Sequence, residues 1–339
     1  MFRPFRTRLA ALGILIALLA GGLGYWLGYR SGRDTMFAIY AQFSPIRLAD
    51  NADPLISPLL GYHAPEATTV GQYESLNASL QSAVATATQS GSASRVSVYF
   101  RDLGTNAWIG VNQTDTFYPA SLLKVPVMIA YYKEAESDPG LLDRTLIYQN
   151  IPLPDPFDAT STLAVGQSYT INQLIDHMII NSDNGATFAL LNHIDPTVLS
   201  QVYTDLGIAD PGDNSGTYQI ATRTYALFFR ILYNATYLSP AYSEKALELL
   251  ARATFKDGLV AGVPAGTAIA HKFGEHIVSN DGTTVAGVEL SDCGITYYPA
   301  HPYLLCVMTS ATDLSSATSI IKNISALTYT AIEKQYPAK

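Results

Sequence analysis

The chain of 339 residues is 48% apolar, which is enough to fill the core of one large domain or of two small ones. Its formal net charge is −8, and the acidic excess lies beyond residue 33, because the first 33 residues contain five arginines and no acidic residue. An acidic body without a basic stripe repels polyanions, so no nucleic-acid partner is expected.

The N-terminal segment, residues 1–30, predicts a transmembrane anchor. Leu9 to Tyr29 is a run of 21 residues without a charge, long enough to cross a hydrocarbon core as a helix. Trp26 and Tyr29 suit a membrane interface, which favours an uncleaved anchor. The alternative is a signal segment cleaved near the small residues Ala20–Gly22. Under both interpretations the rest of the chain is exported, to the periplasmic or extracellular side.

Residues 31–69 are rich in proline, alanine and aspartate without a sustained period, so they are interpreted as a linker or stalk. The folded domain is expected over residues 70–339. Helical spacing of Leu76, Leu80 and Val84 predicts its first helix, and alternating apolar residues on both sides of Gly104–Asn106 predict a hairpin. The elements expected in chain order are a helix at 73–90, strands at 95–101 and 108–111, mostly helix over 120–252, strands at 268–273, 285–289, 294–298 and 303–309, and a helix at 315–334.

This order of elements predicts an α/β (α+β) fold. Strands from both ends of the chain would form one antiparallel sheet, with a helical lobe inserted between them. We expect a functional site in the cleft where the lobe meets the sheet.

The two cysteines, Cys293 and Cys306, lie in two successive predicted strands. If Tyr298 faces Tyr303, the cysteines share a face but lie diagonally, too far apart for a bridge, whereas a shorter turn would bring them opposite each other. A disulfide and a pair of small buried core residues both remain open.

The first motif with chemical potential is Ser121-Leu122-Leu123-Lys124. Residues three apart share a helix face, so the Lys124 amine can reach the Ser121 hydroxyl and accept its proton. Pro126 fits only the first turn of a helix, which places Ser121 at the helix N-terminus. Alone, this tetrapeptide also occurs on ordinary surface helices.

Two further motifs follow along the chain. Ser182-Asp183-Asn184 lies between two apolar helical segments, where any of the three alone would be read as an N-cap. His271-Lys272-Phe273-Gly274 ends a predicted strand, where an isolated lysine is usually an edge residue.

Taken together, the three motifs resemble the S-x-x-K, S-D-N and K-T-G set of class A β-lactamases and the related penicillin-binding D,D-peptidases. Ser121 and Ser182 are 61 residues apart, much as in that family, and the resemblance covers about residues 70–335. It implies an antiparallel five-stranded sheet flanked by helices, with an inserted all-helical lobe, in a β-lactamase/transpeptidase-like catalytic domain.

The resemblance also implies catalytic roles. Ser121 would attack a lactam or amide carbonyl and form an acyl-enzyme, with Lys124 as base or proton relay. Ser182 would pass a proton to the leaving nitrogen. The oxyanion hole would consist of the backbone N–H groups of Ser121 and Glu275.

The substrate-binding residues implied in the same way are Asn184, Lys272, Phe273 and Gly274. Asn184 would bind the side-chain amide of the substrate, and Lys272 would supply positive potential. Phe273 and Gly274 complete the third motif. Asp183 would hold its turn by hydrogen bonds.

The chain departs from the family at two places. No glutamate occurs from Asp205 to Thr224, where class A enzymes carry the glutamate that activates the deacylating water, and only Asp210 and Asp213 offer carboxylates there. The third motif has Phe273 in place of a hydroxyl residue that helps to bind a substrate carboxylate. Without a water-activating base, the acyl-enzyme should persist.

We therefore expect a serine hydrolase that acts, slowly, on β-lactams. One alternative is a cell-wall D,D-peptidase or transpeptidase, and a second is a non-hydrolytic, membrane-tethered sensor of β-lactams or muropeptides. The expected partners are a small β-lactam or a peptidoglycan peptide, and the membrane through the N-terminal helix. No cofactor or metal is expected, because His177, His271 and His301 form no metal-ligand spacing.

Overall fold

The structure is a computed structural model that describes residues 46–47, 55–56, 59–60, 71–149, 161–212, 217–279 and 284–337. The chain divides into two units, Met1–Arg47 and Leu48–Lys339, and the fold below is that of the second. The predicted membrane anchor, residues 1–30, lies outside the described residues. Among the residues that are described, no helix combines the length and the apolar character needed to cross a bilayer.

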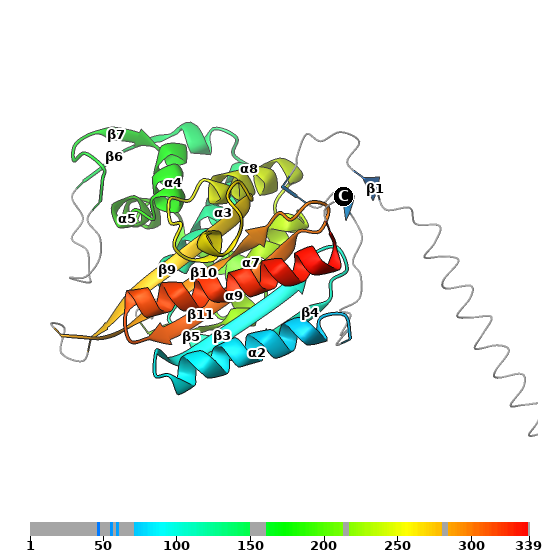
Figure 1. Cartoon of the computed structure of the whole chain (residues 1–339). Coiled ribbons are helices and arrows are strands. Elements are labelled where there is room, and N and C mark those ends of the chain that lie inside the picture. The colour runs from blue at the N-terminus through cyan, green and yellow to red at the C-terminus, as the bar shows by residue number, and fades with distance from the viewer. Residues whose placement is uncertain are drawn as a thin grey trace, which may run out of the picture. The chain divides into compact units, whose positions relative to one another are not determined.

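An antiparallel five-stranded sheet forms the centre of the domain (Figure 1). Its order β4-β3-β11-β10-β9 places strands from the two ends of the chain next to each other, because β3 pairs with β11. This confirms the predicted architecture. The strands are β3 (Ala93–Asp102), β4 (Trp108–Val111), β9 (Ile269–Ser279), β10 (Val285–Thr296) and β11 (Tyr303–Ala311).

The separate strands predicted at 285–289 and 294–298 were wrong, because β10 runs without a break through the polar residues between them. One of them, Asp292, is buried in a specific pair that a hydropathy pattern does not reveal. Asp292 contacts His271 of β9, with 2.8 Å between Oδ1 and Nδ1, and both side chains are fully buried. A paired polar group can continue a buried strand, whereas an unpaired one would end it.

Two helices cover one face of the sheet, α2 (Glu74–Gln89) and α9 (Leu314–Gln335), and lie side by side in Figure 1. Leu76, Leu80 and Val84 of α2 are buried, as their helical spacing predicted. They share a core with apolar residues of the sheet and with Ile321 of α9. The first and last predicted helices are thus confirmed.

The predicted helical lobe covers the other face of the sheet. Its α3, α4, α7 and α8 bury a second apolar core against sheet residues such as Cys293 and Leu304. The elements of the lobe are η1 (Ala120–Leu123), α3 (Lys124–Ala135), η2 (Leu141–Asp143), α4 (Ile171–Ile180), α5 (Asn184–Leu191), α6 (Pro196–Asp205), α7 (Thr222–Tyr233) and α8 (Pro240–Ala251). The turn η4 (Leu259–Gly262) follows α8 and packs against α9 instead. Short strands of this unit are β2 (Leu59–Leu60), β5 (Thr116–Phe117), β6 (Thr145–Ile147), β7 (Ser168–Thr170) and β8 (Ile220–Ala221), whereas β1 (Ile46–Arg47) belongs to the first unit.

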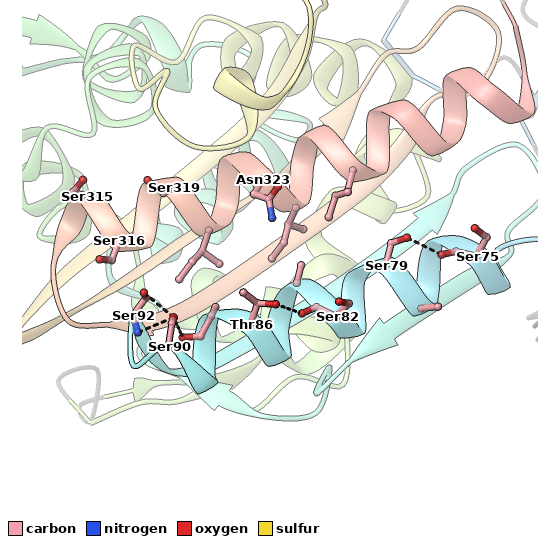
Figure 2. A pocket seen from close by; sticks show the side chains of 16 residues that line it. Ser75, Ser79, Ser82, Thr86, Ser90, Ser92, Ser315, Ser316, Ser319 and Asn323 are labelled. Atoms are coloured by element: carbon pink, nitrogen blue, oxygen red, sulfur yellow. Dashed lines mark hydrogen bonds between the residues drawn. The ribbon is translucent and has the colours of Figure 1, made fainter.

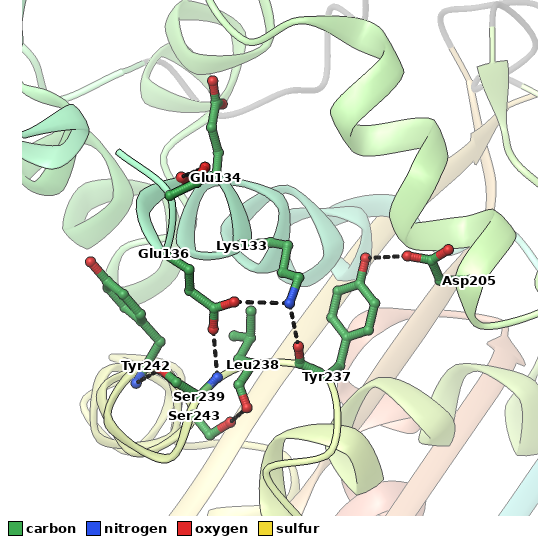
Figure 3. A network of polar contacts seen from close by, with 10 residues as sticks. Lys133, Glu134, Glu136, Asp205, Tyr237, Leu238, Ser239, Tyr242 and Ser243 are labelled. Carbon is green, nitrogen blue, oxygen red and sulfur yellow. Dashed lines mark hydrogen bonds and ion pairs between the residues drawn. The ribbon is translucent and has the colours of Figure 1, made fainter. Parts of the chain in front are cut away.

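A polar network at the end of α3 joins three helices of the lobe (Figure 3). Lys133 pairs with Glu136 at 2.8 Å and donates to the Tyr237 carbonyl oxygen at 2.9 Å. Glu136 accepts from the N–H of Ser239, the N-cap of α8, at 2.5 Å. The Tyr237 hydroxyl donates to Asp205 at the end of α6. The network therefore fixes the C-terminal end of the helix that begins at Lys124.

Part of the predicted stalk packs against the domain. The backbone N–H groups of Leu55 and Ile56 donate to the buried Glu244 carboxylate of α8, each at 2.9 Å. Tyr297 donates to the Leu55 carbonyl oxygen at 2.9 Å, and Ile56 is only 2% exposed. Leu55 and Ile56, which the sequence assigned to the stalk, are therefore packed against α8 and the end of β10.

The cysteines form a Cys293–Cys306 disulfide across β10 and β11. The strands pair Thr296 with Tyr303, which sets the two cysteines directly opposite each other. The diagonal arrangement considered from the sequence was wrong, because the connection between the strands runs from Tyr297 to Pro302 and leaves Tyr298 outside the ladder. The same register places Cys293 opposite Lys272 of β9.

Candidate active site

Ser121 lies in the turn η1 that leads directly into α3, and it is half-buried. Pro126 occupies the first turn of α3, as predicted. The turn is held by a 3.0 Å bond from the Leu122 N–H to the Pro119 carbonyl oxygen. From behind, the buried Tyr225 hydroxyl donates to the Leu122 carbonyl oxygen at 2.9 Å. Ser121 is thus accessible at a helix start whose backbone is fixed from both sides.

Two residues of the site have left-handed backbone conformations without being glycine. Ala120, which precedes Ser121, has φ 48°, and Ser182 has φ 56°. This conformation costs about 1–2 kcal/mol for a residue with a side chain, and it persists where the surrounding contacts determine it. Both turns are therefore held in shape by their contacts.

The second motif meets the first through Lys124, which is only 3% exposed. Its Nζ donates to the Ser182 carbonyl oxygen at 2.5 Å, to Asn184 Oδ1 at 2.6 Å and to Ser182 Oγ at 3.1 Å. The turn between α4 and α5 therefore presents three oxygens to one amine. Lys124, Ser182 and Asn184 form a single cluster, although 58 residues separate the first two.

Lys272 reaches the same hydroxyl from the sheet. Its Nζ donates to Ser182 Oγ at 2.9 Å and to the Phe273 carbonyl oxygen at 2.8 Å. Burial, and secondarily the nearby Lys124 charge, lower the pKa of Lys272 well below its ordinary value, while Asp292 acts in the opposite direction. One hydroxyl between two amines can accept from one and donate to the other when one amine is neutral, so this group can relay a proton.

Asp183 holds the Ser182 turn. Its carboxylate accepts from the Ala186 N–H, as the N-cap of α5, and from the Ser161 hydroxyl, both at 2.8 Å. The other oxygen accepts from the Thr162 N–H at 2.8 Å. Burial opposes the charge, but these hydrogen bonds hold the pKa of Asp183 below its ordinary value.

We expect Asp183→Asn to lower the free energy of unfolding by about 2–4 kcal/mol near neutral pH, because an amide cannot accept all of these bonds. The folded-state pKa of Asp183 lies below its unfolded value, so the stabilisation is present above the unfolded pKa and lost as pH falls through the folded one. Urea unfolding at about pH 7 and about pH 3 should show the difference shrinking in acid. Asp195→Asn, at the exposed N-cap of α6, is the control. An equal loss at both pH values would contradict a role for the charge.

The third motif packs closely against η1, the turn that carries Ser121. A Cβ at Gly274 would collide with the Pro119 carbonyl oxygen and lie 3.1 Å from the Leu122 backbone nitrogen. Glycine at this position therefore lets β9 approach the turn that carries Ser121. Glu275, predicted to contribute its backbone N–H, follows directly on this strand with an exposed side chain.

Phe273 packs against a residue that the sequence did not single out. Its ring is stacked on that of Phe255, with 4.2 Å between centroids and 17° between planes. Phe255 lies in the connection after α8, outside any motif, and no sequence signal pointed to it. The Lys272 Nζ lies 4.3 Å from the Phe273 ring centroid, so the stacked pair borders the cluster around Ser182.

Of the two aspartates considered as substitutes for the family's glutamate, Asp210 accepts from the Gly212 N–H at 2.9 Å within its own exposed turn. Asp213 lies outside the described residues. Asp205 receives hydrogen bonds from Gln201 and Tyr237. In the described parts of residues 205–224, Asp205 and Asp210 therefore both hold local structure by accepting hydrogen bonds.

A groove of about 950 Å³ between α2 and α9 lies away from this cluster (Figure 2). Its lining contains none of the motif residues and is rich in small polar side chains, among them Ser79, Ser82, Ser315 and Ser319. The two helices cover the sheet face opposite the lobe, so this groove is not the site of the predicted chemistry.

Comparison with known proteins agrees with this geometry. The sequence model of the beta-lactamase enzyme family matches residues 77–332. No curated protein matches the chain in sequence. A mutant of PBP-A, solved as an acyl-enzyme complex with penicillin-G, aligns with a TM-score of 0.64 and 23% identity over 80% of this chain and 100% of that one.

Two further solved structures share the fold. A class A beta-lactamase from Mycobacterium abscessus aligns with a TM-score of 0.63 and 20% identity, over 76% of this chain and 99% of that one. A beta lactamase from Xanthomonas campestris pv. campestris aligns with a TM-score of 0.64 and 20% identity, over 76% and 98%. The match of the family model over most of the folded domain identifies this chain as a member of the beta-lactamase enzyme family, a serine hydrolase of the β-lactamase type.

Proposed function

We propose that Ser121 is acylated by β-lactams and that the resulting acyl-enzyme is hydrolysed slowly. The observation that carries this proposal is the hydroxyl of Ser182, which lies between the amines of Lys124 and Lys272 at 3.1 and 2.9 Å. Two ammonium groups around one hydroxyl repel each other, so the pair titrates jointly and one amine becomes neutral below the ordinary pKa of lysine. A neutral amine is what a serine nucleophile needs as its base.

The proposed acylation runs as follows. Lys124, one turn after Ser121, takes the hydroxyl proton while Ser121 Oγ bonds to the carbonyl carbon. Ser182 gives its proton to the leaving nitrogen and regains one from Lys124. The carbon–nitrogen bond breaks, and the acyl group remains as an ester on Ser121. Asn184 and Lys272 position the substrate, and the backbone N–H groups of Ser121 and Glu275 bind the developing oxyanion.

Slow hydrolysis follows from the carboxylates available for the second step. In the described parts of residues 205–224, Asp205 and Asp210 are occupied by local hydrogen bonds. Water attack on the ester would then lack general-base assistance. The same deficit supports the alternative function, a D,D-peptidase or transpeptidase of cell-wall peptides, in which a persistent acyl-enzyme serves transfer. A sensor that binds β-lactams or muropeptides without turnover is the remaining candidate.

Mass spectrometry of the intact chain after mixing with penicillin G tests the proposal. We expect a mass increase equal to one whole penicillin on the residue Ser121, formed within minutes and lost over a much longer time. Loss of the adduct as fast as it forms would indicate an efficient hydrolase. An unchanged mass would contradict acylation and favour the non-covalent sensor.

We also propose that residues 1–30 anchor the enzyme in the membrane with the catalytic domain outside the cytoplasm. The uncharged run from Leu9 to Tyr29 supports an anchor, and the Cys293–Cys306 disulfide suits an oxidising compartment. Protease added to cells with a permeabilised outer surface should degrade the domain and spare cytoplasmic markers. A released protein whose N-terminus lies near Gly22 would instead show a cleaved signal segment.

A further inference from the structure

An aromatic wall, formed by Phe255 and Phe273, borders the position of the leaving group. The two rings are stacked at 4.2 Å, and both side chains are partly exposed. In the proposed acylation, Ser182 delivers its proton to the leaving atom. Lys272 Nζ contacts Ser182 Oγ at 2.9 Å and lies 4.3 Å from the Phe273 ring centroid. The Phe273 ring therefore lies next to the lysine that contacts the proton donor for the leaving atom.

The segment that carries Phe255 is tied to the Ser182 turn. The Thr254 N–H and hydroxyl donate to the Ile180 carbonyl oxygen, at 3.0 and 2.9 Å, two residues before Ser182. The aromatic wall thus belongs to the same local structure as the proton relay.

A buried pair fixes the wall from the other side. Asp292 accepts from the Leu259 N–H at 2.9 Å and from His271, the residue before Lys272. A Cβ at Gly258 would collide with this carboxylate and lie 2.9 Å from the Phe255 ring. The connection between α8 and β9 therefore packs so closely that Phe255 is fixed on Phe273.

The charges around the wall disfavour an anionic leaving group. Phe273 has no hydroxyl to donate, and the Lys272 amine already donates to Ser182 Oγ and to the Phe273 carbonyl oxygen. Strand alternation places the exposed Glu275 on the same side of β9 as Phe273. A carboxylate bound here would lose hydrogen bonds and meet a negative charge, whereas an apolar group would gain aromatic contacts.

We propose that the Phe255–Phe273 wall selects acyl donors with an uncharged, preferably aromatic leaving group, in place of the carboxylate-bearing leaving group of D-alanine-terminated peptides. This specificity rests on the proposed acylation of Ser121. It makes a carboxylate-bearing β-lactam a poor substrate and a neutral ester, thioester or substituted amide a better one.

Three thioesters with one common acyl group, N-benzoylglycyl, test this selection on the full chain in detergent. Their leaving groups are mercaptoacetate, which is anionic, mercaptoacetamide, which is neutral, and benzyl thiol, which is aromatic. Ser121 Oγ bonds to the carbonyl carbon, the carbon–sulfur bond breaks, and the thiol leaves with the proton from Ser182. Water then cleaves the ester. A colorimetric thiol reagent follows release, and Ser121→Ala gives the background.

The rate compared is that of the first burst of thiol, which reports acylation, because the later hydrolysis of the common acyl-enzyme is the same for all three thioesters. We expect wild type to be acylated faster by the benzyl and amide thioesters, and Phe273→Thr to lower the amide-to-carboxylate ratio of acylation rates by about tenfold. Comparing the two proteins cancels the intrinsic reactivities of the leaving groups. Phe255→Leu keeps an apolar surface and should lower only the rate with the benzyl thioester, by about fivefold.

If thiol release still depends on Ser121 but the amide-to-carboxylate ratio is the same in wild type and Phe273→Thr, the proposed selection is wrong. The proposed acylation of Ser121 would not be contradicted by that result. Should Phe273→Thr fail to fold, a benzyl thioester rate unchanged in Phe255→Leu would overturn the selection equally. Absence of Ser121-dependent release with all three thioesters would contradict the proposed function itself.

Discussion

Replacing Ser121 with alanine should abolish covalent labelling by both a fluorescent penicillin and a fluorophosphonate. The hydroxyl lies at the start of a helix, one turn before Lys124, and it is the only atom of that turn able to form an ester with the reagent. Labelled protein separated by gel electrophoresis should fall below detection in the variant, a loss of at least about 10³-fold, because the bond between the reagent and Ser121 Oγ can no longer form.

A matched serine provides the control. Ser319→Ala removes an exposed hydroxyl in the groove between α2 and α9 and should leave labelling unchanged. The thermal unfolding of both variants should match that of wild type, which separates loss of chemistry from loss of fold. Equal labelling of Ser121→Ala and wild type would refute the nucleophile assignment.

Deacylation should be slower than acylation by about 10²–10⁴-fold, the usual contribution of a general base, because Asp205 and Asp210, the carboxylates in the described parts of residues 205–224, are held by local hydrogen bonds. Stopped-flow mixing with a chromogenic cephalosporin should therefore show a burst of about one product per enzyme, followed by a slow steady state. Phe273→Thr should enlarge the rate of the burst, because it restores a donor for the substrate carboxylate, and leave the steady rate unchanged. The two steps use different groups, so a single substitution can separate them.

Steady-state turnover as fast as that of a dedicated β-lactamase, without a burst, would show that another carboxylate activates the water. Asp213 and Glu275 are then the first residues to replace. Glu275 is exposed, and partial desolvation raises the pKa of its carboxyl, which would suit a base better than a fully solvated glutamate.

The parts of the fold that depend on local periodicity could be predicted from the sequence. The spacing of Leu76, Leu80 and Val84 defined α2, and Pro126 placed Ser121 at a helix start. Chain order alone gave one sheet built from both ends. These features depend on residues close together along the chain, and the spacing of such residues can be read from a single sequence.

The features that the sequence left open depend on neighbours across strands. Cys293 faces Cys306 only because β10 and β11 pair in one particular register, with Thr296 opposite Tyr303. The length of the turn between the strands sets this register, and the positions of the two cysteines in the sequence do not reveal it. The continuity of β10 depends on Asp292 finding His271 on another strand. Phe255 enters the site because a connection of no recognisable motif folds back onto β9, and only the assembled sheet shows this contact.

The strained backbone at Ala120 and Ser182 has an evolutionary consequence. Glycine at either position would relieve about 1 kcal/mol of strain, so selection for thermal robustness alone would favour it. At Ser182 that gain would remove the hydroxyl between the two lysines. At Ala120 it would allow the nucleophile turn more conformations than the one now held by Leu122 and Tyr225. Directed evolution for heat resistance, without selection for activity, should therefore select glycine at these two positions. The resulting proteins would have a higher thermal stability and a lower rate of acylation.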